Sequence, residues 1–289
     1  PSGYMTTDEV VELCRAIRGY EGAFYATHAR VGAGRQLTMI EEAIEIGRRA
    51  EIPVQFSHLA ITDRRFYGRG SEMTDLLERA RQDGVDITYD VYPYTAAQAG
   101  LDQLVPIWVQ TGGIDQYVAR LQDPATRSKV RDEVAAGIGG LTPEFDTWVI
   151  ASVKTEANAG VVGKSVEEIA SQRGIEPAEA VLQIEEEEHG GESAVIHNRV
   201  EGDVRHFLTH PLAMIGSDGE AISPTGVRSV EQLHPRFYGT YPRILGRYVR
   251  EQSLLTLETA VHKMSDFPAE RLSLRDRGRV EEGLIADLA

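Results

Sequence analysis

The sequence predicts an α/β protein built on a parallel β-sheet. In the first third of the chain, apolar strand-like runs alternate with amphipathic helical patterns about every 30 residues, as in right-handed β-α-β units. The strand-like runs are mostly apolar, as expected when both faces of a sheet are covered. Two architectures are common with this pattern, a doubly wound open sheet and a (β/α)8 barrel. No Gly-x-Gly-x-x-Gly follows any of these strands, which weakens the nucleotide-binding alternative.

Each element of this first part has a local signal. Thr6 opens a helix as part of an N-cap cluster, and the apolar residues that follow recur near the 3.6-residue helical period. Pro53 stands at the first position of a strand, where proline is tolerated, and Gly84 is a plausible helix C-cap. The predicted helices are 6–17, 37–50 and 73–80, and the predicted strands are 22–28, 53–58 and 85–92.

The rhythm breaks between about 95 and 145, where glycines interrupt short helical pieces; such an insertion after a strand is typical of a lid or specificity loop. We expect the alternation of strands and helices to resume after residue 145. The predicted strands are 148–153, 193–197 and 213–216, and the predicted helices are 166–173, 177–187 and 256–264. We expect the chain, which begins at Pro1 without Met, to be a piece of a longer protein whose last strand starts near its end.

Composition excludes several classes of function. The 289 residues carry a net charge of −15, which argues against a nucleic-acid backbone or an anionic membrane as a partner. Cys14 is the only cysteine, so neither an internal disulfide nor a cysteine-based zinc cage forms within the chain, and a reducing cytoplasm is the default location. No apolar run approaches the ~20 residues of a membrane-spanning helix. The sequence makes no prediction of oligomeric state.

His28 and His58 each stand at the end of a predicted strand. Because ligands of parallel α/β folds bind at the carboxyl ends of strands, the two imidazoles are placed to converge on one point and bind Zn²⁺. Either histidine alone is better explained as a hydrogen-bonded core residue. Their matched placement on successive strands favours the metal site.

Asp218 follows a short apolar strand and stands between Ser217 and Gly219. It is interpreted as a metal-bridging carboxylate or a general base, with an ordinary Asp-Gly turn as the alternative. Tyr92 ends the third strand and is placed to polarise a substrate carbonyl, although aromatic core packing explains it equally well. Arg236 lies in a segment rich in Arg, Tyr and His and suits carboxylate capture, with a surface loop as the alternative.

These segments occur in an order that resembles the N-acyl-D-amino-acid deacylases (D-aminoacylases) of the amidohydrolase superfamily. The matching pieces, which cover nearly the whole chain, are Pro1–Thr7, Tyr25–Arg30, Ser57–Leu59, Tyr89–Tyr94, Gly163–Ser165, Ile215–Gly219, His234–Leu245, Asp276–Gly278 and Gly283–Asp287. No single piece is decisive, but the ordered set is specific.

The resemblance implies a (β/α)8 barrel, TIM-like, present as its later part over residues 1–275, with 276–289 starting a small β-sandwich. It implies one or two zinc ions held by His28 and His58, and Asp218 as the catalytic carboxylate. It implies that Tyr92 faces the carbonyl of a small N-acyl-D-amino acid, whose amide bond is hydrolysed by zinc-activated water.

Two departures from the family pattern affect these expectations. The family's first-strand His-x-His pair and its metal-ligating Cys belong upstream of Pro1, so the remaining ligands are expected there. Ala60 and Gln98 replace a Lys and a Ser of the family that bear on binding of the substrate carboxylate. Arg30 or Arg236 is the candidate to take over that role.

Two alternatives stay open. One is a cyclic-amide hydrolase similar to dihydroorotases or hydantoinases, which use a carbamylated lysine as metal bridge; neither Lys154 nor Lys164 ends a strand near His28, which disfavours it. The other is a non-catalytic, truncated barrel that acts as a binding module.

Overall fold

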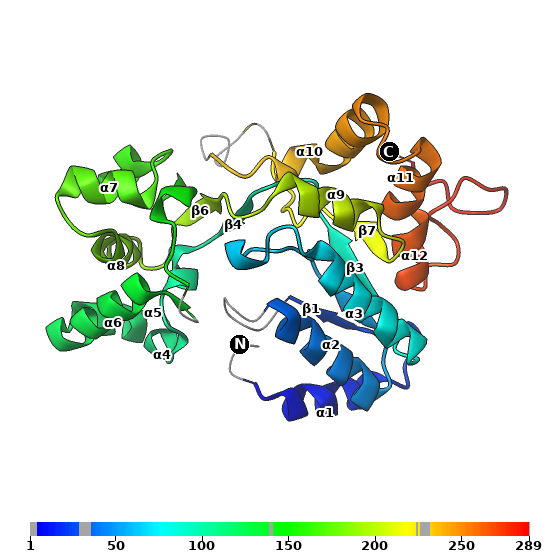
Figure 1. Cartoon of the computed structure of the whole chain (residues 1–289), viewed down its shortest axis with the longest axis horizontal. Coiled ribbons are helices and arrows are strands. Elements are labelled where there is room, and N and C mark those ends of the chain that lie inside the picture. The colour runs from blue at the N-terminus through cyan, green and yellow to red at the C-terminus, as the bar shows by residue number, and fades with distance from the viewer. Residues whose placement is uncertain (1–4, 29–35, 139–140, 224, 226–231, 289) are drawn as a thin grey trace.

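A computed structural model gives the arrangement of the chain (Figure 1). It describes residues 5–28, 36–138, 141–223, 225 and 232–288. Within these residues the strands form two sheets, one parallel and one antiparallel, each with its own apolar core. The predicted α/β class with a parallel sheet is therefore confirmed.

The parallel sheet has the strand order β1-β2-β3-β7. Its strands are β1 (Tyr25–Thr27), β2 (Val54–Phe56), β3 (Ile87–Val91) and β7 (Ala213–Ile215). The helices around it are α1 (Thr7–Ile17), α2 (Gln36–Ala50), α3 (Gly70–Gln82), α9 (Glu201–Thr209), α11 (Leu257–Met264) and α12 (Asp266–Arg271). Helices α2 and α3 connect successive parallel strands, as the sequence predicts.

Helix α1 begins with the predicted cap. The Thr6 hydroxyl accepts from the Glu9 backbone N–H at 3.2 Å, and the Glu9 carboxylate accepts from the Thr6 N–H at 2.7 Å. Its apolar stripe is only partly covered: Cys14 is buried, but Leu13 is 59% exposed. Within the described residues α1 packs chiefly on one neighbour, α2, and a single helix covers a narrow strip.

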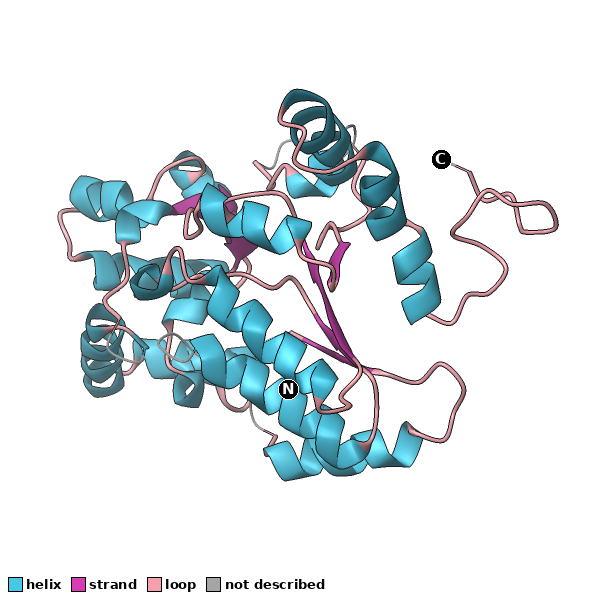
Figure 2. Cartoon of the chain, turned by 45° about the vertical axis from the view of Figure 1, so that its right-hand side comes forward, coloured by secondary structure: helices cyan, strands magenta, loops and turns pink. Residues whose placement is uncertain are grey.

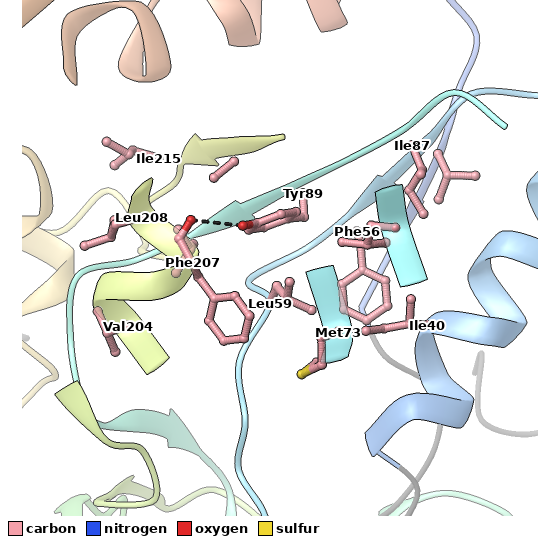
Figure 3. Packing of buried hydrophobic residues seen from close by; sticks show 14 of the residues in the cluster. Ile40, Phe56, Leu59, Met73, Ile87, Tyr89, Val204, Phe207, Leu208 and Ile215 are labelled. Carbon is pink, nitrogen blue, oxygen red and sulfur yellow. Dashed lines mark hydrogen bonds between the residues drawn. The ribbon is translucent and has the colours of Figure 1, made fainter. Parts of the chain in front are cut away.

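The core of the parallel sheet is formed by side chains of its strands and of the helices against them (Figure 3). Phe56 of β2 and Met73 of α3 are buried together, and Phe207 of α9 lies beside Tyr89 of β3. The Tyr89 hydroxyl donates to the Phe207 carbonyl at 2.9 Å, which satisfies its one polar group. This core fixes the strands whose ends carry the candidate site.

The second sheet has the antiparallel order β4-β6-β5. Its strands are β4 (Ala97–Ala99), β5 (Trp148–Ser152) and β6 (Ser193–Ile196), and its helices are α4 (Ile107–Gln110), α5 (Ile114–Gln122), α6 (Pro124–Ala136), α7 (Val166–Arg173) and α8 (Pro177–Glu188). The predicted strands at 148–153 and 193–197 are present, but they do not continue the parallel sheet, because β5 and β6 pair antiparallel; the parallel sheet resumes only with β7. An apolar strand followed by helices has the same sequence pattern in a parallel and in an antiparallel sheet, so the pattern does not predict the direction of pairing.

The last part of the chain differs from expectation in two ways. Helix α10 (Arg236–Arg243), which contains Pro242, continues into a π-helical segment (Ile244–Glu251), whereas the sequence predicts no helix there and a surface loop is one alternative. Residues 272–288 form turns, and no strand lies among them in the described part of the chain (Figure 2). No helix in the described ranges is long and apolar enough to span a membrane.

A buried carboxylate lies under the antiparallel sheet. Glu185 of α8 is fully buried, and its carboxyl group lies beside the side chains of Glu192 and Tyr117. Burial, reinforced by the charges of Glu192 and Asp102, raises the pKa of Glu185 to about 9. The folded chain therefore holds this carboxyl group neutral at pH 7.

This buried acid predicts a loss of stability with rising pH. The unfolded state releases the Glu185 proton near pH 4.5 and the folded state near pH 9, so the free energy of unfolding falls across that window. We expect Glu185→Gln to raise the free energy of unfolding at pH 8 by about 1–3 kcal/mol and to leave it nearly unchanged at pH 4. Urea unfolding at both pH values measures this. The exposed Glu167→Gln on α7 is the control; equal effects of both variants would contradict the prediction.

Candidate active site

Three predicted site residues gather at the carboxyl edge of the parallel sheet. His28 directly follows β1, His58 follows β2, and Asp218 follows β7. Nδ1 of His28 lies 2.7 Å from Nε2 of His58, and the ring centroids are 4.5 Å apart. The two imidazoles from neighbouring strands therefore converge on one point.

Asp90 of β3 holds the turn that carries His58. Its Oδ1 accepts from the His58 backbone N–H at 2.8 Å, and its Oδ2 accepts from Gln55 Nε2, also at 2.8 Å. His58 itself has a left-handed backbone with φ of 40°, which is uncommon for a residue with a side chain and typical of functional turns. The neighbouring strand thus fixes the backbone turn that carries the His58 side chain.

The electrostatics favour neutral imidazoles. Burial lowers the pKa of His28, and it lowers the pKa of His58 to about 4, while the negative charge of Asp218 opposes both shifts. Neutral imidazole has the free lone pair that a metal ion needs.

The histidine pair fits part of a zinc site. Two nitrogens bound to one tetrahedral Zn²⁺ at about 2.0–2.1 Å are about 3.3 Å apart, so a separation of 2.7 Å requires a small opening of the pair. No group of three or more His, Cys, Asp or Glu side chains that could hold a metal occurs within the described ranges. The donor type therefore fits, and the pair accounts for two ligands.

Asp218 is held by an arginine. Arg236 Nη1 lies 2.8 Å from Asp218 Oδ2, and the Arg236 side chain is nearly buried. The backbone N–H of Arg236 donates to His234 Nδ1 at 3.0 Å, and His234 Nε2 lies 3.0 Å from the Ala96 carbonyl. Burial and the Arg236 charge lower the pKa of His234 to about 4, so this histidine is a neutral support for the start of α10.

Tyr92 is buried between two cations. The guanidinium carbon of Arg199 lies 4.3 Å from its ring centroid, and that of Arg236 lies 4.8 Å from it. Arg30, the other predicted carboxylate-binding residue, lies outside the described residues. Of the six predicted site residues, the structure thus places five, and it links Tyr92 to Asp218 through Arg236.

A cavity of about 410 Å³ opens beside Asp218 and Arg236. Its lining comes from both sheets: Asp218, Gly219, Glu220, Arg236 and Phe237 on one side, and Gln98, Ala99, Gly100 and Ser193 on the other. Gln98 joins the two sides, because its Oε1 accepts from the His234 N–H at 2.7 Å and its Nε2 donates to Ser193 Oγ at 3.0 Å. Gln98, which replaces a serine of the deacylase family pattern, therefore lines the cavity.

Sequence reasoning assigned no role to Asp90 or Arg199. For Asp90 the sequence holds a signal, because this carboxylate lies near the end of an apolar predicted strand that neighbours the strand before His58. For Arg199 the sequence gives no signal, since this residue lies in the link between β6 of the antiparallel sheet and α9.

Comparison with known proteins gives consistent results. No family model matches the chain. It is 30% identical over 289 residues to N-acyl-D-aspartate deacylase of Alcaligenes xylosoxydans xylosoxydans, covering all of this chain and 48% of that protein. It superposes with a TM-score of 0.75 on N-acyl-D-glutamate deacylase from Bordetella bronchiseptica, solved with zinc and a phosphonate mimic of the tetrahedral intermediate; the identity is 25%, and the match covers 99% of this chain and 50% of that one.

A third match is the crystal structure of a D-aminoacylase described as defining a novel subset of amidohydrolases. The TM-score is 0.72 at 29% identity, and the match covers 98% of this chain and 48% of that one. The chain thus spans about half the length of the relatives it matches. The resemblance to N-acyl-D-amino-acid deacylases is confirmed. Over its whole length, the chain is homologous to a segment that makes up about half of each of these relatives.

Proposed function

We propose that this chain is part of a zinc-dependent hydrolase that cleaves the amide bond of N-acyl-D-amino acids, releasing a carboxylic acid and a D-amino acid. The observation that carries the proposal is the His28–His58 pair at the carboxyl edge of a parallel sheet, with Asp218 close enough for its charge to act on both rings. The homology to deacylases, one of them solved with zinc, supports the same chemistry.

We propose the sheet β1-β2-β3-β7 as part of a (β/α)8 barrel that extends over residues 1–275. The insertion begins near residue 95, and because the second apolar cluster reaches Ile196, we extend it beyond 145. Residues 276–289 are proposed to lead into a small β-sandwich. A cytoplasmic location, suggested by the single cysteine, also remains a proposal.

His28 and His58 would hold one or two zinc ions together with ligands supplied from upstream of Pro1. Zinc, when bound, supplies Lewis-acid activation of water and of the substrate carbonyl. The lowered pKa of both imidazoles favours the neutral form that binds a metal. The hydrogen bond from the His58 backbone N–H to Asp90 fixes the turn on which one of the two ligands lies.

Asp218 is proposed as the general base that accepts a proton from the attacking water and returns it to the leaving amine. Its ion pair with Arg236 keeps the carboxylate in a fixed orientation beside the cavity. Tyr92, fixed between two guanidinium groups, is proposed to donate its hydroxyl hydrogen to the substrate carbonyl oxygen. Arg236 or Arg30 is the proposed partner of the substrate carboxylate.

The first test addresses the metal. We expect His28→Ala and His58→Ala each to weaken zinc binding by at least about 100-fold, because each removes a ligand rather than a supporting group. Competition with a chromogenic chelator, on the full gene product that contains these residues, measures the affinity. The exposed His262→Ala is the control, and unchanged affinity in both ligand variants would contradict the assignment.

The second test addresses the base. We expect Asp218→Asn to lower kcat for N-acetyl-D-amino acids by about 10²–10⁴-fold, because the amide cannot accept the proton. The matched control is Asp146→Asn, which changes an exposed aspartate outside the cavity. Steady-state kinetics measure both variants. Activity of Asp218→Asn close to that of the control would remove Asp218 from the mechanism.

A further inference from the structure

The antiparallel part of the chain has an apolar core of its own. This part begins at Ala97 and ends in the link after Ile196. Its core is built from buried side chains of β5, β6 and helices α4–α8, and among the described residues no member of it also belongs to the core of the parallel sheet. A contiguous segment that buries its own apolar side chains has the means to fold and unfold as a separate cooperative unit.

The chain enters and leaves the antiparallel part at one place. Ala97 of β4 pairs with Ile196 of β6 in the antiparallel ladder. Just outside these two residues, the guanidinium carbon of Arg199 lies 4.3 Å from the centroid of the Tyr92 ring. If residues 97–196 unfold, the parallel part therefore gains one long loop with neighbouring ends. The entropy cost of closing such a loop grows only with the logarithm of its length.

Polar contacts join the antiparallel part to the parallel one. The Gln98 side chain accepts from the His234 backbone N–H at 2.7 Å, beside the place where the chain crosses. Arg64 and Glu144 form an ion pair between the two parts, with nitrogen and oxygen 2.8 Å apart. Both of these side chains are more than two-fifths exposed, and an exposed ion pair contributes little to stability. Domains that meet through polar contacts can separate without exposing either core.

The antiparallel part also contains a group that weakens it. Glu185 is fully buried on α8, beside Glu192 and Tyr117, and Asp102 adds a further negative charge nearby. Within the described residues Glu185 forms no ion pair with a cation, and burial of a carboxyl group that lacks such a partner costs free energy. The antiparallel part is therefore the one that we expect to unfold first.

We propose that residues 97–196 unfold as one unit while the parallel part stays folded, and that this opening controls the affinity for substrate. The opening removes the wall of the cavity that comes from the antiparallel sheet, which is formed by Gln98, Ala99, Gly100 and Ser193. The histidine pair and Asp218 belong to the parallel part and stay in place. The apparent affinity then falls in proportion to the fraction of molecules in which the unit is folded.

Hydrogen exchange of the full gene product, measured by mass spectrometry in increasing sub-denaturing urea, follows the opening segment by segment. We expect peptides from β5, β6 and α5–α8 to converge on one exchange rate with one urea dependence. Peptides from β2, α3 and β3 exchange more slowly at the same urea concentration. A single group that includes both sheets, or separate opening of the individual helices of the antiparallel part, overturns the proposal.

Matched core variants test the independence of the two parts. Leu182 of α8 and Leu77 of α3 are both fully buried, one in each core. We expect Leu182→Ala to speed exchange of the antiparallel group by about 100-fold and to change the exchange of β2, α3 and β3 by less than about threefold. Leu77→Ala has the opposite pattern, and equal acceleration of both groups overturns the proposal. If the leucine variants do not fold, Ile184→Val and Ile87→Val make the same comparison with changes of about 2–10-fold.

The link to substrate affinity is tested by the kinetics of the full gene product with N-acetyl-D-methionine in the same urea series. We expect KM to be about twofold higher where half of the molecules are open and about tenfold higher where nine-tenths are open. The value of kcat stays unchanged, because saturating substrate restores the folded unit. Leu182→Ala shifts this rise in KM to lower urea concentrations.

The two measurements separate this proposal from the proposed function. The kinetic arm rests on the proposed function for the identity of the substrate, whereas hydrogen exchange needs no turnover. A KM that does not follow the opening overturns the control of substrate affinity. Absence of hydrolysis of any N-acyl-D-amino acid rejects the deacylase function, and the exchange data then still decide whether residues 97–196 open as one unit.

Discussion

The carboxylate of Asp90 is the group on which the candidate site depends. It lies on β3 and reaches across to β2, where it holds the Gln55 amide and the backbone N–H of His58. Burial raises the pKa of Asp90, while these two hydrogen bonds lower it, so they offset part of the cost of placing a carboxylate inside the sheet. The pairing of two parallel strands thereby fixes the backbone turn from which the His58 side chain projects.

The two parts of the chain have different tasks. The parallel part presents the histidine pair, Asp218 and Tyr92 at the ends of its strands, which is where parallel folds bind ligands. The antiparallel part closes the other side of the cavity with Gln98 and Ser193, which are joined by a hydrogen bond. The Gln98 side chain links this wall to the start of α10, because its Oε1 accepts a hydrogen bond from the His234 backbone N–H. The histidine pair and the opposite wall of the cavity therefore come from different parts of the chain.

Tyr92 organises the positive charge of the site. Its ring contacts the guanidinium groups of both Arg199 and Arg236, although the two arginines come from opposite parts of the chain. Of the two, only Arg236 forms an ion pair with a carboxylate within the described residues, at 2.8 Å from Asp218.

The parallel strands and their helices can be predicted from the sequence, because strand and helix periods and caps such as that at Thr6 are local properties. The sequence also placed His28, His58 and Asp218 at strand ends, which fixes their common edge once the sheet is parallel. The tertiary structure alone decided that Trp148–Ser152 and Ser193–Ile196 pair antiparallel, since an apolar run carries no record of its partner. The contact of Arg199 with Tyr92 also depends on tertiary structure, because the two residues lie more than a hundred positions apart in the chain.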